Sequence, residues 1–162
     1  MKVVIFLFTL IFFSCTNHNA RIRSIATENT PITQQEKSIA KNLIQGAFDD
    51  LWGGMDSTKI LDYHTEDFII LENGEVWDND RIKQFMRKQL AQEDRAKRIN
   101  MMDYISIEKY GPSMQIAYQN NADFYKQDSL VNKGAWLESA LAVKTDRGWR
   151  LKMMHSTWNR KK

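Results

Sequence analysis

The spacing of apolar residues changes near Ile99, and this change limits most strongly how the chain can fold. Before it, apolar side chains recur every four residues at Ile39, Leu43, Ala47 and Leu51, a period typical of one face of an α-helix. After it, apolar and polar residues alternate, which is typical of half-buried β-strands. The sequence therefore predicts an α+β domain, with helices covering one face of a curved sheet.

Three helices are predicted in the first half of the chain. Thr33 and Glu36 have the spacing of a capping box, and the helix behind them ends at Gly53-Gly54. Asp56 can cap a short second helix that reaches Tyr63. Asp78 or Asn79 can cap a third helix, whose apolar positions are Ile82, Phe85, Met86 and Leu90. The charged residues 93–98 after it are predicted to be its solvated end.

The strands are predicted from alternation and turn residues. The turn Asn73-Gly74 joins a strand at 68–71 to another at 75–77, because Asn-Gly favours a tight hairpin. Two longer strands follow, at 104–110 and 114–125, and residues 126–132 are predicted to be a polar loop.

The last two strands form a predicted hairpin around the turn 145–148. With a four-residue loop, Lys144 faces Trp149 and Glu138 faces His155. A shift of one residue would move one strand's side chains to the other face, so this pairing depends on the loop length. Paired in this way, the carboxylate and the imidazole could transfer a proton near neutral pH, or simply stabilise the sheet.

The N-terminus predicts export. Residues 3–13 are almost entirely apolar, a run too short to span a bilayer and typical of a signal peptide. Ser14-Cys15 follows, and a small residue before the only cysteine resembles a bacterial lipoprotein signal. A plain signal peptide or an uncleaved anchor is the alternative. The predicted segments are a signal peptide at 1–14, an acylated Cys15 that begins a flexible tether at 15–32, and a domain at 33–160. The location implied is the bacterial cell envelope or periplasm, with the protein held on the membrane by its lipid.

From Thr33 to Trp158 the order of elements resembles the nuclear-transport-factor-2-like (NTF2-like) superfamily and its SnoaL-like members. The terminal hairpin is similar to that of the association (hub) domain of calcium/calmodulin-dependent kinases, in which Glu is followed by Trp and then His at the spacing of Glu138, Trp149 and His155. The resemblance implies a cone of three helices on a strongly curved antiparallel sheet. It also implies a homodimer, because exposed sheet surfaces in this superfamily commonly pair.

The candidate site residues match that superfamily in one place and differ from it in another. Tyr63 and Asp67 resemble the aromatic-x-x-x-Asp stretch that leads into the superfamily's first strand. The arginines of the hub pocket fall on Ala140 and Ser156 here, so its anion-binding character is not inherited.

The resemblance implies a ligand pocket at the open mouth of the cone. Its predicted polar lining is Tyr63, His64, Asp67, Glu138 and His155. Its predicted apolar walls are Trp77, Phe85, Trp136 and Trp149. The simpler interpretations are that His64 caps a helix or lies on the surface, that Asp67 ends a turn, and that the tryptophans belong to the core.

Two functions remain open on this basis. One is a non-catalytic, lipid-anchored module that binds a small apolar or amphipathic molecule or serves as an accessory domain. The other is a cofactor-free isomerase, cyclase or dehydratase resembling ketosteroid isomerase, with Asp67 or His155 as base, Glu138 orienting it and Tyr63 as donor. No metal-ligand spacing or phosphate-binding loop occurs, so neither a metal nor a cofactor is expected. The net charge of +3 gives no case for nucleic acid.

Overall fold

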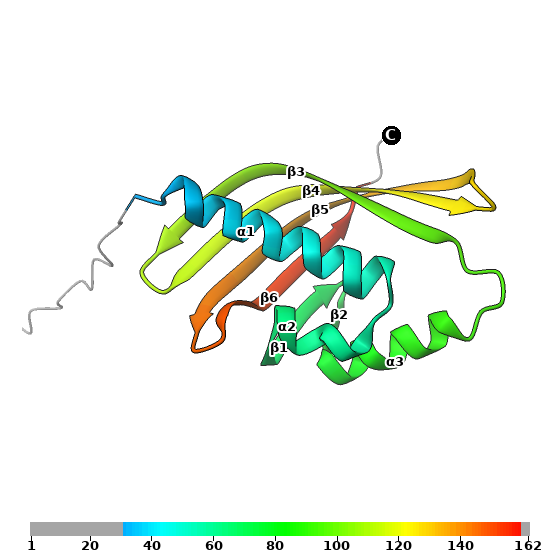
Figure 1. The fold of residues 1–162 in the computed structure, drawn as a ribbon, viewed down its shortest axis with the longest axis horizontal. Helices are drawn as coiled ribbons and strands as arrows, with labels where there is room; N and C mark the ends of the chain where they lie inside the picture. Colours follow the sequence, from blue (N-terminus) through cyan, green and yellow to red (C-terminus); the bar gives the residue numbers. More distant parts are fainter. Residues whose placement is uncertain (1–30, 160–162) are drawn as a thin grey trace, which may run out of the picture.

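Helices cover one face of the sheet in the computed structural model, which describes residues 31–159 (Figure 1). Helix α1 (Gln34–Ala47) begins at the predicted capping box, with the Thr33 backbone N–H donating to Glu36 and the Glu36 N–H donating to the Thr33 hydroxyl. The π-helix η1 (Phe48–Gly53) continues it. The short helices η2 (Ser57–Lys59) and α2 (Ile60–Tyr63) follow, and Asp78 caps α3 (Asn79–Leu90). The three predicted helices are therefore confirmed.

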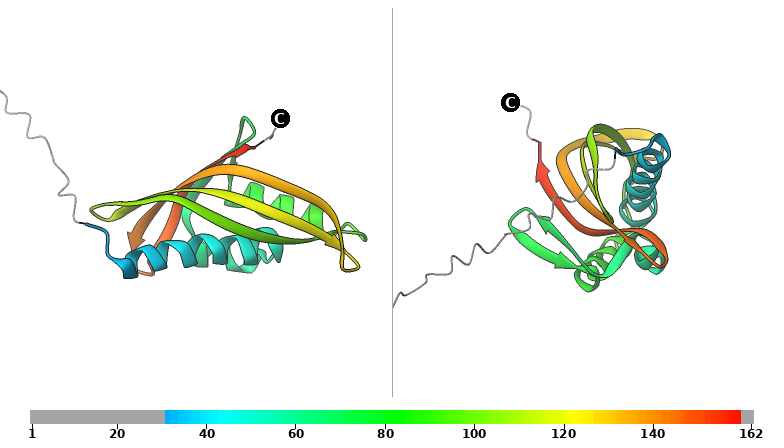
Figure 2. Two further views of the ribbon diagram at one scale, coloured as in Figure 1. Left: turned by 90° about the horizontal axis from the view of Figure 1, so that it is seen from above. Right: turned by 90° about the vertical axis from the view of Figure 1, so that its left-hand side faces the viewer.

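Six strands form one sheet in the order β2-β1-β6-β5-β4-β3. The strands are β1 (His64–Glu72), β2 (Glu75–Asp78), β3 (Lys97–Tyr110), β4 (Ser113–Lys126), β5 (Ser129–Thr145) and β6 (Gly148–Trp158). Their order confirms the predicted α+β class. The sheet is mixed rather than fully antiparallel, because β1 and β6 run parallel while the other neighbours run antiparallel. Figure 2 shows how strongly the sheet curves.

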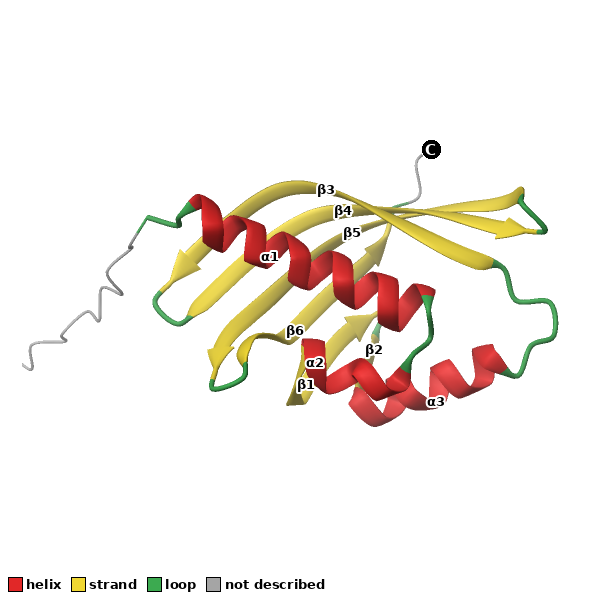
Figure 3. Ribbon diagram, in the orientation of Figure 1, coloured by secondary structure: helices red, strands yellow, loops and turns green. Residues whose placement is uncertain are grey.

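The core lies between α1 and the concave face of the sheet (Figure 3). Ala40, Ile44 and Ala47 of α1 are buried there, as the helical period predicted. Side chains from β4 and β6, including Ile116 and Met154, complete this core. Within residues 31–159 no helix is both long and apolar enough to cross a bilayer.

Two predictions about connections need correction. Residues 126–132 are not a loop: β4 and β5 turn at Gln127 and Asp128, whose φ angles of 44° and 64° suit a two-residue hairpin. Residues 93–98 are not wholly a solvated end, because β3 begins at Lys97. The predicted signal peptide, Cys15 and nearly all of the tether lie outside the described residues and stay predictions.

Candidate functional site

A cavity of about 440 Å³ opens between the sheet, the π-helix η1, the β1–β2 hairpin and α3. Its apolar lining is Phe48, Trp52, Ile70, Trp77, Phe85, Trp136 and Trp158. Its polar lining is Glu72, Asn73, Glu75, Arg98, Glu138 and Ser156. This volume, and a wall that combines six aromatic side chains with a few polar groups, are typical of a small-molecule site.

The aromatic walls are held by their neighbours. The π-helix η1 carries Phe48 and Trp52, whose rings are 6.2 Å apart. Phe85 of α3 lies 5.9 Å from Trp52 and 5.4 Å from Trp77. π-Helical turns are often found at functional sites, and this one turns two aromatic side chains towards the cavity.

Another part of the wall is the edge-on pair of Trp136 and Trp158, whose ring centroids are 4.7 Å apart. A Cβ at Gly134 would collide with the Trp136 indole, so the glycine leaves the space into which that ring folds.

A row of polar side chains crosses the concave face of the sheet. The cross-strand pairing joins Tyr104 to Tyr118, Tyr118 to Glu138, Glu138 to Ser156, and Ser156 to Glu72. Directly opposed residues share a face of a sheet, so these five side chains point the same way. The row brings Glu138, Ser156 and Glu72 to the wall of the cavity.

Glu138 is the most perturbed group of this row. It is only 6% exposed, and its Oε1 accepts a hydrogen bond from Ser156 at 2.9 Å. Its Oε2 and the Tyr118 hydroxyl are buried without a hydrogen-bond partner among the described residues. Burial raises the pKa of Glu138 to about 7, although the Ser156 hydrogen bond, the charge of Arg98 and the nearby Tyr118 hydroxyl act in the opposite direction. The cavity therefore holds a carboxyl group that can gain or lose a proton near neutral pH.

Arg98 brings the positive charge of the cavity and was missed by the sequence analysis, which placed it at a solvated helix end. Its Nε donates to Asn100 Oδ1 at 2.8 Å, and its guanidinium lies 4.6 Å from the ring centroid of Trp136. Burial lowers the pKa of Arg98, while Glu138 and Glu72 raise it. The alternation of β3 could have revealed this residue, because stepping back from Tyr104 by twos reaches Arg98 on the same face.

The predicted pairing of Glu138 with His155 is wrong. The hairpin has the predicted register near its turn, with Lys144 opposite Trp149 and Ala142 opposite Leu151. The register then shifts, because Leu141 faces Met153 and Lys152 is an extra residue in β6. This β-bulge places Ser156 opposite Glu138 and turns His155 to solvent on the other face.

Asp67 and Tyr63 also lie away from the cavity. Asp67 is exposed on β1 and forms an ion pair with Lys152, the extra residue of the bulge. The Tyr63 hydroxyl donates to Asp50 instead, and its ring packs against Gly46, where a Cβ would lie 2.9 Å from Cε1. Neither side chain is placed to act with Glu138.

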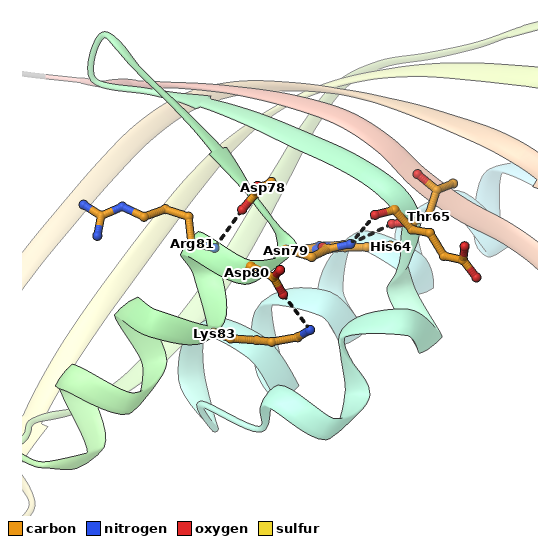
Figure 4. Close-up of polar contacts among 8 residues, drawn as sticks. His64, Thr65, Asp78, Asn79, Asp80, Arg81 and Lys83 are labelled. Atoms are coloured by element: carbon orange, nitrogen blue, oxygen red, sulfur yellow. Dashed lines mark hydrogen bonds and ion pairs between the residues drawn. The ribbon is translucent and has the colours of Figure 1, made fainter.

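His64 is a buried core residue rather than a cavity or surface residue. Its Nδ1 lies 2.9 Å from Asn79 Oδ1, and its ring stacks on Phe68 at 3.7 Å. The amide of Asn79 also donates to the carbonyls of Thr65 and Glu66, so this one residue ties the start of α3 to β1 (Figure 4). Burial lowers the pKa of His64 to about 4.

Four predicted residues do meet at the cavity: Glu138, Trp77, Phe85 and Trp136. Trp149 is buried in the core and does not line it. Within the described residues, no group of three His, Cys, Asp or Glu side chains is arranged to hold a metal ion.

No family model and no curated protein sequence matches the chain, but solved structures do. The CaMKII hub of S. rosetta has a TM-score of 0.62 at 13% identity, over 80% of this chain and 100% of that one. An NTF2-like protein from Cytophaga hutchinsonii has a TM-score of 0.59 at 10% identity, over 79% and 100%. A ketosteroid isomerase-like protein from Erwinia carotovora atroseptica has a TM-score of 0.60 at 12% identity, over 80% and 100%. The chain therefore has the NTF2-like fold, which hosts both binding proteins and enzymes.

Proposed function

We propose that this domain binds a small amphipathic molecule in the aromatic cavity. The observation that carries the proposal is a cavity of about 440 Å³ with six aromatic side chains and a buried carboxyl group whose Oε2 has no hydrogen-bond partner within residues 31–159. Apolar walls favour a ligand's hydrophobic body, and a few convergent polar groups fix its orientation. The sequence-based prediction of export and acylation at Cys15 would place this cavity in the bacterial cell envelope.

Binding is tested with 2-naphthol, a neutral aromatic probe with one hydroxyl group. We expect it to quench tryptophan fluorescence and to raise the melting temperature, because Trp52, Trp77, Trp136 and Trp158 line the cavity. The Trp136→Ala variant should bind about tenfold more weakly, since it loses one wall of the cavity.

The matched control is Leu137→Ala, the next residue of β5, whose side chain is 52% exposed and points to the opposite face. This variant should bind like the unmodified protein. The proposal fails if neither 2-naphthol nor other aromatic probes of its size bind the folded protein, or if the two variants lose affinity equally.

A second candidate is proton-transfer catalysis, which the raised pKa of Glu138 beside the Tyr118 hydroxyl favours. The discriminating measurement is deuterium exchange at the carbon next to the carbonyl of 2-tetralone in D2O, followed by NMR. Exchange that is faster than in buffer, and that is lost in Glu138→Gln, would support an enzyme. Binding of 2-tetralone without exchange would leave the binding function alone.

A further inference from the structure

The cavity wall carries more negative charge than the protein itself balances. Glu72, Glu75 and Glu138 line it. Glu75 lies 3.7 Å from Arg81 and accepts a hydrogen bond from Trp77. Arg98 is then left to balance both Glu72 and Glu138, and within residues 31–159 it forms no ion pair at 4.0 Å or less with either of them.

The aromatic walls are suited to positive charge. Three of them already hold a guanidinium, because Arg98 lies over Trp136 and Phe48, and Arg81 lies 5.1 Å from the centroid of Trp77. The electron-rich face of an aromatic ring attracts a cation, most strongly where water is excluded. No lysine or arginine of the described part of the chain lies over Trp52, Phe85 or Trp158, although all three line the cavity.

The carboxylate of Glu138 has no positively charged hydrogen-bond donor among the described residues. Its Oε1 is occupied by Ser156, whereas its Oε2 is buried and has no partner among the described residues. The other groups that face it are Tyr118 from β4, Arg98 from β3 and Glu72 from β1. A buried carboxylate with one free oxygen is costly unless a donor, and preferably a positive one, reaches it.

We propose that the ligand is an organic ammonium ion, a protonated amine on an aromatic or alicyclic body, whose N–H donates to the Glu138 carboxylate at the cavity wall. This inference rests on the proposed small-molecule function and specifies the chemical class of the ligand. The body of the ligand packs against Trp52, Phe85 and Trp158, and the added positive charge balances the carboxylate that Arg98 compensates only in part. A neutral alcohol can donate the same hydrogen bond but adds no charge, and a carboxylic acid adds a charge of the wrong sign.

The binding should be linked to proton release. An ammonium ion prefers the ionised form of Glu138, whereas burial favours the protonated form at acidic pH. The amine should therefore bind at least about tenfold more tightly at pH 8 than at pH 5.5, because the carboxyl group ionises between these values. The neutral alcohol should show no such gain.

The experiment compares three probes that share one body: 2-(2-naphthyl)ethylamine, 2-(2-naphthyl)ethanol and 2-naphthylacetic acid. Each is titrated into the full chain at pH 5.5 and pH 8, and binding is followed by tryptophan fluorescence and calorimetry. At pH 8 we expect the amine to bind most tightly and the acid most weakly. In Glu138→Gln the amine should lose about tenfold in affinity and its pH dependence, while the alcohol keeps its affinity. Glu93→Gln, in the exposed turn after α3, is the charge-matched control and should change neither.

The possible failures can be told apart. If the alcohol binds as tightly as the amine, or the acid binds most tightly, the ligand is not a cation although the cavity still binds small molecules. If none of the three binds the folded protein although 2-naphthol does, only the inference is wrong. If 2-naphthol also fails to bind, both the inference and the proposed function are wrong. The pH dependence in the unmodified chain gives a test that does not rely on any variant folding.

Discussion

Replacing Glu138 with glutamine should stabilise the protein at pH 8 by roughly 3 kcal/mol, because a pKa raised from 4.5 to about 7 corresponds to that energy. The folded state disfavours the ionised carboxylate, which is buried and only partly compensated. The unfolded chain ionises the same group freely near its ordinary value of 4.5. This contribution to stability is thus fully present below pH 4.5 and is lost as the pH rises through about 7.

Glutamine removes the charge while keeping the shape, and its Oε1 can still accept the hydrogen bond from Ser156. The difference in the free energy of unfolding between Glu138→Gln and the unmodified protein should grow from near zero at pH 4.5 to its full size at pH 8. Urea unfolding at pH 4.5, 6 and 8 measures it, with Glu93→Gln as the exposed control. A constant difference at all three values, or a less stable variant at pH 8, would contradict the raised pKa.

Acid should destabilise the protein through His64, whereas it stabilises the protein through Glu138. Burial lowers the pKa of this imidazole from 6.5 to about 4, so the folded state holds it neutral. The unfolded chain takes up a proton below pH 6.5, which the buried ring resists. About 3 kcal/mol of stability, present above pH 6.5, should be lost as the pH falls through about 4.

Two variants of His64 test this expectation. His64→Gln can keep a hydrogen bond to Asn79, and His64→Phe can keep the stacking on Phe68. Both should be less stable than the unmodified protein at pH 7.5, yet both should lose less stability between pH 6.5 and pH 4. His155→Gln is the matched control, because His155 is exposed, and it should leave the acid dependence unchanged. A variant of His64 with the full acid dependence would show that other groups cause it.

The two titrations partly cancel between pH 4.5 and pH 6.5. Over that range, acidification stabilises the folded state through Glu138, because the buried carboxyl group becomes neutral. It destabilises the folded state through His64, because the unfolded chain binds a proton that the buried ring does not. The unmodified protein should therefore show a flatter stability profile than either set of variants. Removing one group exposes the pH dependence of the other, so Glu138→Gln should be the more acid-sensitive protein.

Much of the fold could be predicted because its signals are local. Thr33 and Glu36 are three residues apart, and Asn73-Gly74 is a two-residue turn, so a short stretch of sequence contains the whole cause of each feature. Trp136 and Glu138 were predicted to line a pocket on the strength of the family resemblance, and both do line the cavity.

The rest of the site could not be predicted because its causes are distant or leave no pattern. The bulge at Lys152 depends on how β6 pairs with both β1 and β5. No residue type near Lys152 indicates that the strand contains a bulge. His64 is buried because Asn79, which is 15 residues away, provides its partner. Arg98 follows a run of charged residues, and only the extension of β3 back to Lys97 shows that it lies on the inner face.

The bulge also changes which residues of β6 point inward: odd-numbered residues do so before Lys152 and even-numbered residues after it. On the turn side of Lys152 the inward set includes Trp149 and Leu151, and beyond it the inward set includes Met154 and Ser156. If β6 paired with β5 without the bulge, Lys152 would face Leu141, and His155 would replace Ser156 opposite Glu138 although the sequence would be unchanged. Deleting Lys152 would instead remove the extra position and leave Ser156 opposite Glu138. The pairing of one strand thus decides whether a hydroxyl or an imidazole lies opposite Glu138, and the same sequence contains both chemistries.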